Sequence, residues 1–144
     1  MADLWVIDSS AWIFALRPRP FEPIRQRVDE LLAEGRVLLT GMIEMEILTG
    51  TRTSKELAEL RELLGGPTRI DTVETDWAAA AEMACGLRRA GYTVPSSDAL
   101  IAHQARRLGA GIVHADRDFV ALCGHYQIEQ EDFSSAVAGR NARY

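Results

Sequence analysis

The sequence predicts an α/β fold built around a central, mainly parallel sheet. Short apolar runs alternate along the chain with longer segments in which apolar residues recur at helical spacing. The run LWVI at 4–7, for example, precedes a segment at 22–34 in which Ile24, Val28 and Leu31 share one face. Such alternation is typical of strand–helix–strand units, whose parallel strands are covered by helices on both faces.

Residues that start or stop regular structure delimit the predicted elements. Pro23 stands in the first turn of the helix at 22–34, and Gly35 follows its last turn. Thr40 and Ser54 can each cap the helix that follows them. In chain order we expect strands at 4–7, 37–39, 69–73, 112–114 and 127–129, and helices at 11–16, 22–34, 40–48, 54–64, 75–90, 96–108 and 117–122.

The length of 144 residues suits one domain with a substantial core. We expect that domain over 1–133, followed by a mobile tail at 134–144, because the closing sequence SSAVAGRNARY has no apolar periodicity. Trp5, Trp12 and Trp77 fall on faces that are predicted to be buried, so we expect all three in the core.

Composition argues against several classes of protein. No apolar run reaches the roughly 18 residues that span a bilayer, and the acidic start MADLWVIDSS does not resemble a signal peptide. Cys85 and Cys123 lack CxxC spacing and are expected to fill core space in a cytoplasmic protein. The net charge of −5 opposes a simple basic surface for nucleic acid, unless bound cations offset some of the acids.

Four carboxylates stand in or beside apolar stretches, where an ionised acid is costly unless another group compensates its charge. A divalent metal is the simplest compensation that all four could share, and carboxylate oxygens suit Mg²⁺ or Mn²⁺. The four are Asp8 in LWVIDSS, Glu46 in EMEILTG, Asp98 in PSSDALIA and Asp116 in HADRDF.

The predicted topology allows these acids to meet. Asp8 directly follows the first strand, and Asp116 lies two residues beyond the end of the strand at 112–114. The carboxyl ends of parallel strands share one edge of the sheet, which is where ligands bind in such folds. Asp98 is expected on the inward stripe of its helix, and Glu46 on a mainly apolar helix face.

Each acid also has a simpler explanation when it is taken alone. Asp116 could be only a helix cap, and Asp98 could only complement a helix dipole. Glu44 could face inward in place of Glu46, because a helical Glu is usually solvated. Asp8 is hardest to dismiss, and the joint occurrence of the four favours a metal site. The histidines lack zinc-site spacing, and the chain has no glycine-rich phosphate loop.

The ordered motifs DSS, EILTG, SSDALIA and ADRDF resemble those of the PIN domain family, above all its VapC-type toxins. The resemblance extends from Asp8 to Phe133. It implies a three-layer α/β/α sandwich and a Mg²⁺- or Mn²⁺-dependent endoribonuclease that acts as the toxin of a type II toxin–antitoxin pair. The implied partners are an RNA substrate, a small antitoxin protein and a second copy of the chain.

The resemblance also implies roles for individual residues. Asp118 matches a further acid that sometimes contributes to the site, and Ser10 matches a hydroxyl residue that orients the first Asp. The residues that match the family's catalytic and metal-binding acids are Asp8, Glu46, Asp98 and Asp116.

One departure from the family pattern concerns the last of these acids. His114 stands where relatives often carry Thr or Ser, which puts the usual hydrogen bond to Asp116 in doubt. Arg17 and Arg19, in a Pro-flanked loop, are candidate contacts for RNA phosphates. The simpler interpretation is that they are solvated charges of the loop.

The expected reaction is hydrolysis of an RNA phosphodiester by metal-activated water, with Asp8 and Asp98 holding the first ion. Alternatives are a PIN-type nuclease in RNA processing or on structured DNA, and a binding module without catalysis. A receiver domain and a DxD phosphatase fit less well, because Asp8 has no adjacent acid and Ser10 occupies the third position.

Overall fold

Five parallel strands form the centre of the fold. The computed structural model describes residues 1–140. The sheet has the order β3-β2-β1-β4-β5, and all neighbouring strands are parallel, which confirms the predicted α/β fold. The strands are β1 Trp5–Ile7, β2 Val37–Thr40, β3 Thr68–Ile70, β4 Gly111–His114 and β5 Gln130–Asp132.

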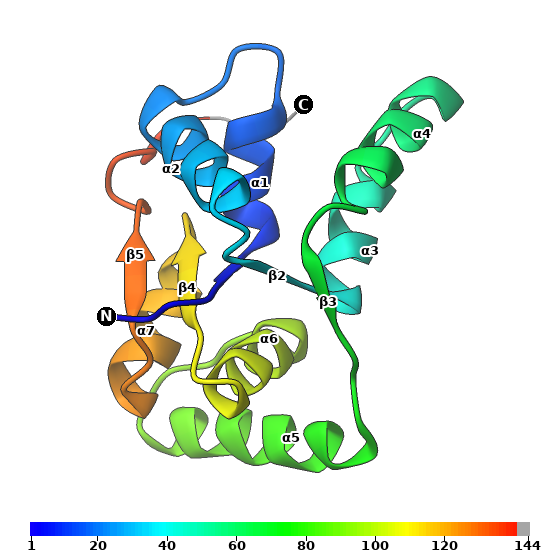
Figure 1. Cartoon of the computed structure of the whole chain (residues 1–144). Coiled ribbons are helices and arrows are strands. Elements are labelled where there is room, and N and C mark those ends of the chain that lie inside the picture. The colour runs from blue at the N-terminus through cyan, green and yellow to red at the C-terminus, as the bar shows by residue number, and fades with distance from the viewer. Residues whose placement is uncertain (141–144) are drawn as a thin grey trace.

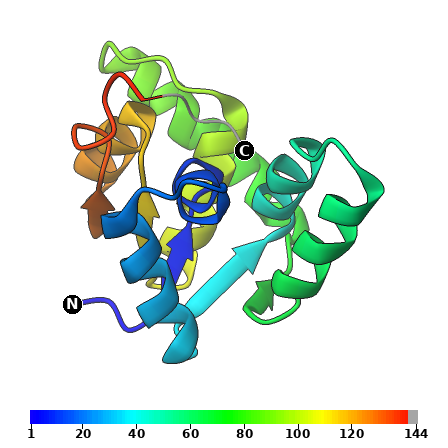
Figure 2. The ribbon, with the colours of Figure 1, turned by 90° about the horizontal axis from the view of Figure 1, so that it is seen from above.

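Helices enclose the sheet on both sides. α1 and α2 lie over one face, and α5 and α6 lie over the other (Figure 1). Seen from above, α3 and α4 stand beside the strands β2 and β3, on that lateral side of the sheet (Figure 2). This arrangement is the expected three-layer sandwich. The helices of the described residues are α1 Ser9–Leu16, α2 Glu22–Ala33, α3 Gly41–Thr49, α4 Ser54–Leu63, α5 Glu74–Arg89, α6 Ser96–Arg107 and α7 Arg117–Tyr126.

The core is tightly packed where β1 meets β4. Trp5 is in register with Gly111, and a Cβ atom on Gly111 would lie 2.4 Å from Cζ3 of Trp5. Glycine is therefore required there, because any side chain would collide with the indole ring. Trp5 and Trp12 are 1% and 0% exposed, as the sequence predicts.

The carboxyl ends of β1 and β4 lead into helices that begin with an aspartate cap. Asp8 accepts a hydrogen bond from the backbone N–H of Ser10 at 3.1 Å, and Asp116 accepts one from that of Asp118 at 3.0 Å. Since β1 and β4 are neighbours, both aspartates lie at the same edge of the sheet. Asp8, one residue after β1, and Asp116, two residues after β4, thus start the helices α1 and α7.

Helix α5 is rotated relative to its predicted orientation. Trp77 is 55% exposed, so its assignment to the core is wrong. Asp76 faces inward instead and accepts hydrogen bonds from α6, at 2.9 Å from Nε2 of His103 and 3.0 Å from Nε of Arg107. A pattern that searches for apolar residues misses a buried acid whose charge is paired. The buried residues of α5 are Asp76, Ala80, Met83 and Leu87.

The same rotation affects one of the cysteines. Cys123 on α7 is buried, as expected, but Cys85 on α5 is exposed. Within residues 1–140, no helix has the length and apolar character that crossing a membrane requires.

The C-terminal part of the chain differs from the prediction in two ways. β5 begins at Gln130 rather than at 127, because α7 continues to Tyr126 and Gln127 closes it with a left-handed φ of 55°. Residues 134–140 are not a separate tail, since Val137 is 6% exposed and belongs to the core cluster. The mobility expected for 141–144 concerns positions outside the described residues.

Candidate active site

Asp8 is a buried carboxylate whose two oxygens have different surroundings. Its Oδ2 accepts hydrogen bonds from the Ser10 backbone N–H at 3.1 Å and from the Ser10 hydroxyl at 2.6 Å. Its Oδ1 is buried and has no hydrogen-bond partner among the described residues. The Ser10 hydroxyl also accepts from the backbone N–H of Ala115 at 3.0 Å, so it connects the end of β1 to the end of β4.

Three further aspartates form the centre of the site. Asp98, in the first turn of α6, is 7% exposed and lies beside the start of α7. One carboxylate oxygen each from Asp98, Asp116 and Asp118 lie within 4.8 Å of one another. Asp8 repels both Asp98 and Asp116 electrostatically, which places it next to this group. The fold thus brings together acids that lie more than a hundred residues apart in sequence.

Helix α3 contributes Glu46, while Glu44 points elsewhere. Glu46 is repelled by Asp8 and Asp116 and receives a hydrogen bond from the side chain of Ser9, and its buried Oε1 has no partner among the described residues. Glu44 forms an ion pair with Arg69 of β3 instead. Glu46 is therefore the α3 acid that lies against the cluster.

Burial and mutual repulsion raise the pKa values of these acids. Burial is the largest cause for Asp98, and repulsion from the neighbouring acids adds to it, so its pKa rises to about 8. Burial and then repulsion from Asp8 raise the pKa of Glu46 to about 7. Burial also raises the pKa of Asp8, although the hydrogen bonds from Ser10 work against it. A divalent cation that bound here would displace protons from the cluster.

His114 forms a hydrogen-bonded support behind Asp116. The ring is fully buried in β4, and its Nε2 lies 2.8 Å from Oε1 of Gln130 in β5. Its Nδ1 accepts from the backbone N–H of Asp116 at 3.3 Å. These two contacts require the tautomer that carries its proton on Nε2. His114 thus supplies Asp116 with a backbone hydrogen bond, despite its departure from the family pattern.

Two neighbours of the acids are absent from the sequence prediction. Ser9 donates to Glu46, and the Tyr92 side chain forms a hydrogen bond with Asp118. The doubled serine after Asp8 is a local signal that could have identified Ser9, because the two hydroxyls serve different acids. Tyr92 lies in the loop before α6 and has no such signal, because its role depends on how that loop packs against α7.

The two loop arginines lie at the far end of α1. Nε of Arg17 donates to the backbone carbonyl of Arg19 at 2.8 Å, and the Arg17 guanidinium lies 4.5 Å from the Phe14 ring centre. The eight residues of α1 separate this loop from Asp8 by about 12 Å. A role in binding RNA phosphates remains a prediction for both residues.

The donor set fits a hard divalent cation. All candidate ligands are carboxylate oxygens, which Mg²⁺ and Mn²⁺ prefer over nitrogen or sulfur. The buried oxygens without partners, Oδ1 of Asp8 and Oε1 of Glu46, are atoms whose burial is costly unless a cation or water compensates them. The site therefore has both the chemistry and the uncompensated charge of a metal centre.

Comparison with known proteins identifies the family to which this chain belongs. A family model of the PIN domain matches residues 5–124. The chain belongs to the PIN domain family. It is 38% identical over 132 residues to the VapC ribonuclease Mb1587 of Mycobacterium bovis and to the ribonuclease VapC11 of Mycobacterium tuberculosis, covering 89% of this chain and 98% of each relative.

Solved structures of VapBC proteins have a similar fold. VapBC2 from Rickettsia felis, bound to a promoter DNA fragment, matches with a TM-score of 0.74 at 15% identity and covers 90% of this chain and 98% of its own. DNA-bound VapBC from Salmonella typhimurium matches with a TM-score of 0.69 at 22% identity, over 90% and 98% of the two chains. The family resemblance drawn from the short motifs is confirmed over most of the PIN domain chain.

Proposed function

We propose that this PIN domain protein is a metal-dependent endoribonuclease and the toxin of a type II toxin–antitoxin pair. The convergence of Asp8, Glu46, Asp98 and Asp116 at one edge of the sheet carries the proposal. The ribonuclease names of relatives that match nearly the whole chain support it. Hydrolysis of an RNA phosphodiester requires charge stabilisation at the phosphate and removal of a proton from water, and these acids suit both tasks.

We assign Asp8 and Asp98 to the first metal ion, with Asp116 and Glu46 completing the site and Asp118 in support. A bound Mg²⁺ or Mn²⁺ would lower the pKa of a water molecule and offset negative charge on the scissile phosphate. Ser10 fixes one oxygen of Asp8, while Oδ1 is buried and has no hydrogen-bond donor among residues 1–140, so it is our candidate metal ligand.

Glu46 is our candidate for the group that orients the attacking water and takes up its proton. In the metal-free site, burial and repulsion from Asp8 raise its pKa to about 7, which makes its carboxylate a stronger base than that of an exposed glutamate. Ser9 donates to its carboxylate, while Oε1 has no donor among the described residues and can accept from water. The buried surroundings of Asp8 and Asp98 keep bulk water from screening these interactions.

RNA cleavage with purified protein tests this function. We expect cleavage of a labelled single-stranded RNA in Mg²⁺ or Mn²⁺, none in EDTA, and none with Asp8→Asn. Metal at a hundredfold excess over Kd should also stabilise the fold by about 2.7 kcal/mol. Metal-independent cleavage, or full activity of Asp8→Asn, would refute the proposed site, and a melting temperature that ignores both metals would contradict metal binding.

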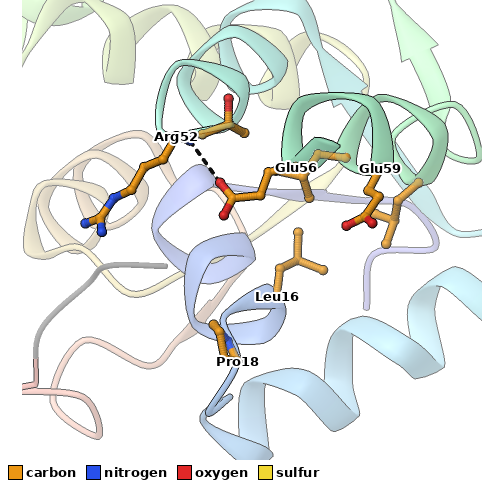
Figure 3. A pocket seen from close by; sticks show the side chains of 8 residues that line it. Leu16, Pro18, Arg52, Glu56 and Glu59 are labelled. Atoms are coloured by element: carbon orange, nitrogen blue, oxygen red, sulfur yellow. Dashed lines mark hydrogen bonds between the residues drawn. The ribbon is translucent and has the colours of Figure 1, made fainter. Parts of the chain in front are cut away.

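We further propose a small antitoxin as the protein partner, with part of its contact in the cleft between the end of α1 and α4. The cleft has a volume of about 430 Å³. Leu16, Leu60 and Leu63 contribute apolar side chains to its lining. Glu56 and Glu59 of α4 lie near Leu16 (Figure 3). An amphipathic helix with basic side chains would match both properties. The full lining is Leu16, Pro18, Thr51, Arg52, Glu56, Glu59, Leu60 and Leu63.

A substitution in this cleft tests antitoxin binding separately from RNA cleavage. We expect the antitoxin to be a small protein encoded beside this chain. Leu60→Asp should weaken its binding, measured by calorimetry, while RNA cleavage by the free enzyme is retained. Unchanged binding would place the antitoxin elsewhere.

We also propose that the protein acts in the cytoplasm as a homodimer. Sedimentation would detect the dimer as a species of twice 15.9 kDa.

A further inference from the structure

A second hollow of the surface adjoins the acidic cluster. Its volume is about 470 Å³, and it lies between the loop before α6, the start of α7 and the segment after β5. Apolar, hydroxyl and charged groups all contribute to it. The lining residues are Tyr92, Arg117, Val120, Ala121, Asp132, Ser134 and Ser135.

Tyr92 joins this hollow to the active site. Its side chain lines the hollow and forms a hydrogen bond with Asp118, whose carboxylate lies within 4.8 Å of Asp98 and Asp116. Tyr92 is 40% exposed, so part of the residue is available to a ligand. A group stacked on Tyr92 would therefore lie close to the acids that are proposed to act on phosphate, because Tyr92 is hydrogen-bonded to one of them, Asp118.

One arginine of the hollow offers a contact for a phosphate group. Arg117, the first residue of α7, interacts electrostatically with both Tyr92 and Asp132 and can contact a phosphate. Asp132, the one acid that residues 1–140 contribute to the lining, accepts a hydrogen bond from the backbone N–H of Ser134 at 2.8 Å. The exposed Val120 and the neighbouring Ala121 add apolar side chains to the lining, which a flat base can cover.

We propose that this hollow is a binding subsite for the nucleotide next to the scissile phosphate, with its base stacked on Tyr92 and a phosphate on Arg117. The inference rests on the proposed ribonuclease function and extends it to the substrate beside the reacting bond. Base stacking on an aromatic ring contributes to single-strand binding without demanding one sequence. The subsite thus favours unpaired RNA, because a base inside a duplex cannot stack on a protein ring.

Equilibrium binding of a fluorescein-labelled RNA hexamer tests the subsite. Ca²⁺ replaces Mg²⁺ in the assay, and gels of the same samples record cleavage. Tyr92→Ala should weaken binding about tenfold. Tyr92→Phe keeps the ring but loses the hydrogen bond to Asp118, so it should bind within twofold of the wild type. If Tyr92→Phe is as weak as Tyr92→Ala, the hydroxyl and not the ring matters, and stacking is refuted.

Hexamers with one abasic nucleotide locate the contact. One abasic position should weaken wild-type binding about tenfold and have almost no effect on Tyr92→Ala, since both changes remove the same stacking contact. Additive losses at every position would overturn the subsite. Trp77→Ala is the matched aromatic control, because this exposed ring lies on the outer face of α5 and should leave binding unchanged.

The salt dependence of RNA binding tests the proposed contact between Arg117 and a phosphate. Arg117→Gln should reduce the slope of log Kd against log salt by about 0.7, the value for one phosphate contact on a single strand. Arg88→Gln, an exposed arginine in the last turn of α5, serves as the control and should keep the slope. An unchanged slope for Arg117→Gln would remove the phosphate contact from the proposal.

The outcomes distinguish this inference from the proposed function. A wild-type protein that cleaves RNA, with Tyr92→Ala binding as tightly as the wild type, would refute the subsite and leave the ribonuclease intact. A wild-type protein that binds the hexamer through Tyr92 but never cleaves RNA with any divalent metal would refute the ribonuclease and leave the subsite intact.

Discussion

The Ser10 hydroxyl lies 2.6 Å from Oδ2 of Asp8 and donates its hydrogen to that oxygen. The same hydroxyl accepts from the backbone N–H of Ala115 at 3.0 Å. One small side chain therefore fixes the orientation of the first acid and ties it to the neighbouring strand. Without this contact, the Asp8 carboxylate would be held by the backbone N–H donors at the start of α1 and would lose its link to β4.

We expect Ser10→Ala to weaken metal binding and RNA cleavage about 10- to 100-fold, the usual loss for a residue that orients a metal ligand. Calorimetry with Mn²⁺ and initial cleavage rates measure the two effects. Ser10→Thr keeps the hydroxyl and is the matched control, which should retain most of both activities. Full Mn²⁺ affinity in Ser10→Ala would show that Asp8 does not need this orientation.

Metal-free protein should lose stability as the pH rises from about 5.5 to 8.5. The pKa values of Asp98 and Glu46, about 8 and about 7, lie above the ordinary values of about 4 in an unfolded chain. The native state therefore binds more protons than the unfolded state in this window, so their contribution to stability is complete near pH 4 and is lost as the pH passes 7 and then 8.

Melting temperatures of metal-free protein across this pH window measure the effect. Asp98→Asn removes the group with the pKa of about 8, so its melting temperature should fall less between pH 7 and 8.5. Glu44→Gln leaves the cluster intact and should follow the wild type. Mn²⁺ affinity should change in the opposite sense and increase with pH, since binding displaces the protons. A melting temperature that rises toward pH 8.5 would contradict these pKa shifts.

The sequence predicted the parallel sheet because its signals are local and repeated. Asp8 and Asp116 follow buried strands within two residues and cap the next helices, and these positions placed them at one edge of the sheet. The orientation of α5 could not be obtained in this way. Asp76 is buried through ion pairs with α6, and a hydrophobic pattern assigns Trp77 to the interior in its place.

The sequence predicted a site residue only where the helix or strand that carries the residue determines its position. The position of Asp98 in the first turn of α6 is visible in the sequence. The choice between Glu46 and Glu44 is not, because it depends on Arg69, which lies on a strand 25 residues away from Glu44. Tyr92 and Gln130 are likewise supplied by segments whose proximity to the acids exists only after folding.

His114 should act as a support for Asp116 that depends on Gln130. His114→Leu removes the acceptor of the Asp116 backbone N–H, and Gln130→Leu removes the acceptor of the imidazole Nε2–H, so each should cost about 1–3 kcal/mol of stability. The double variant should cost less than the sum, because both changes break one chain of hydrogen bonds. Urea unfolding of the four proteins measures this coupling, and strictly additive losses would show that the two contacts are independent.

The two glutamates of α3 offer a matched pair of substitutions. Glu46→Gln should reduce RNA cleavage at least a hundredfold at pH 7.5, because an amide can neither take up a proton nor balance a cation. Glu44→Gln should keep the wild-type rate and lose only the exposed ion pair with Arg69, which contributes about 1 kcal/mol or less. Initial rates and urea midpoints of both variants separate the two roles. A strong loss of cleavage in Glu44→Gln with an active Glu46→Gln would reverse the assignment, because the two residues differ by half a helical turn and only one can face Asp8.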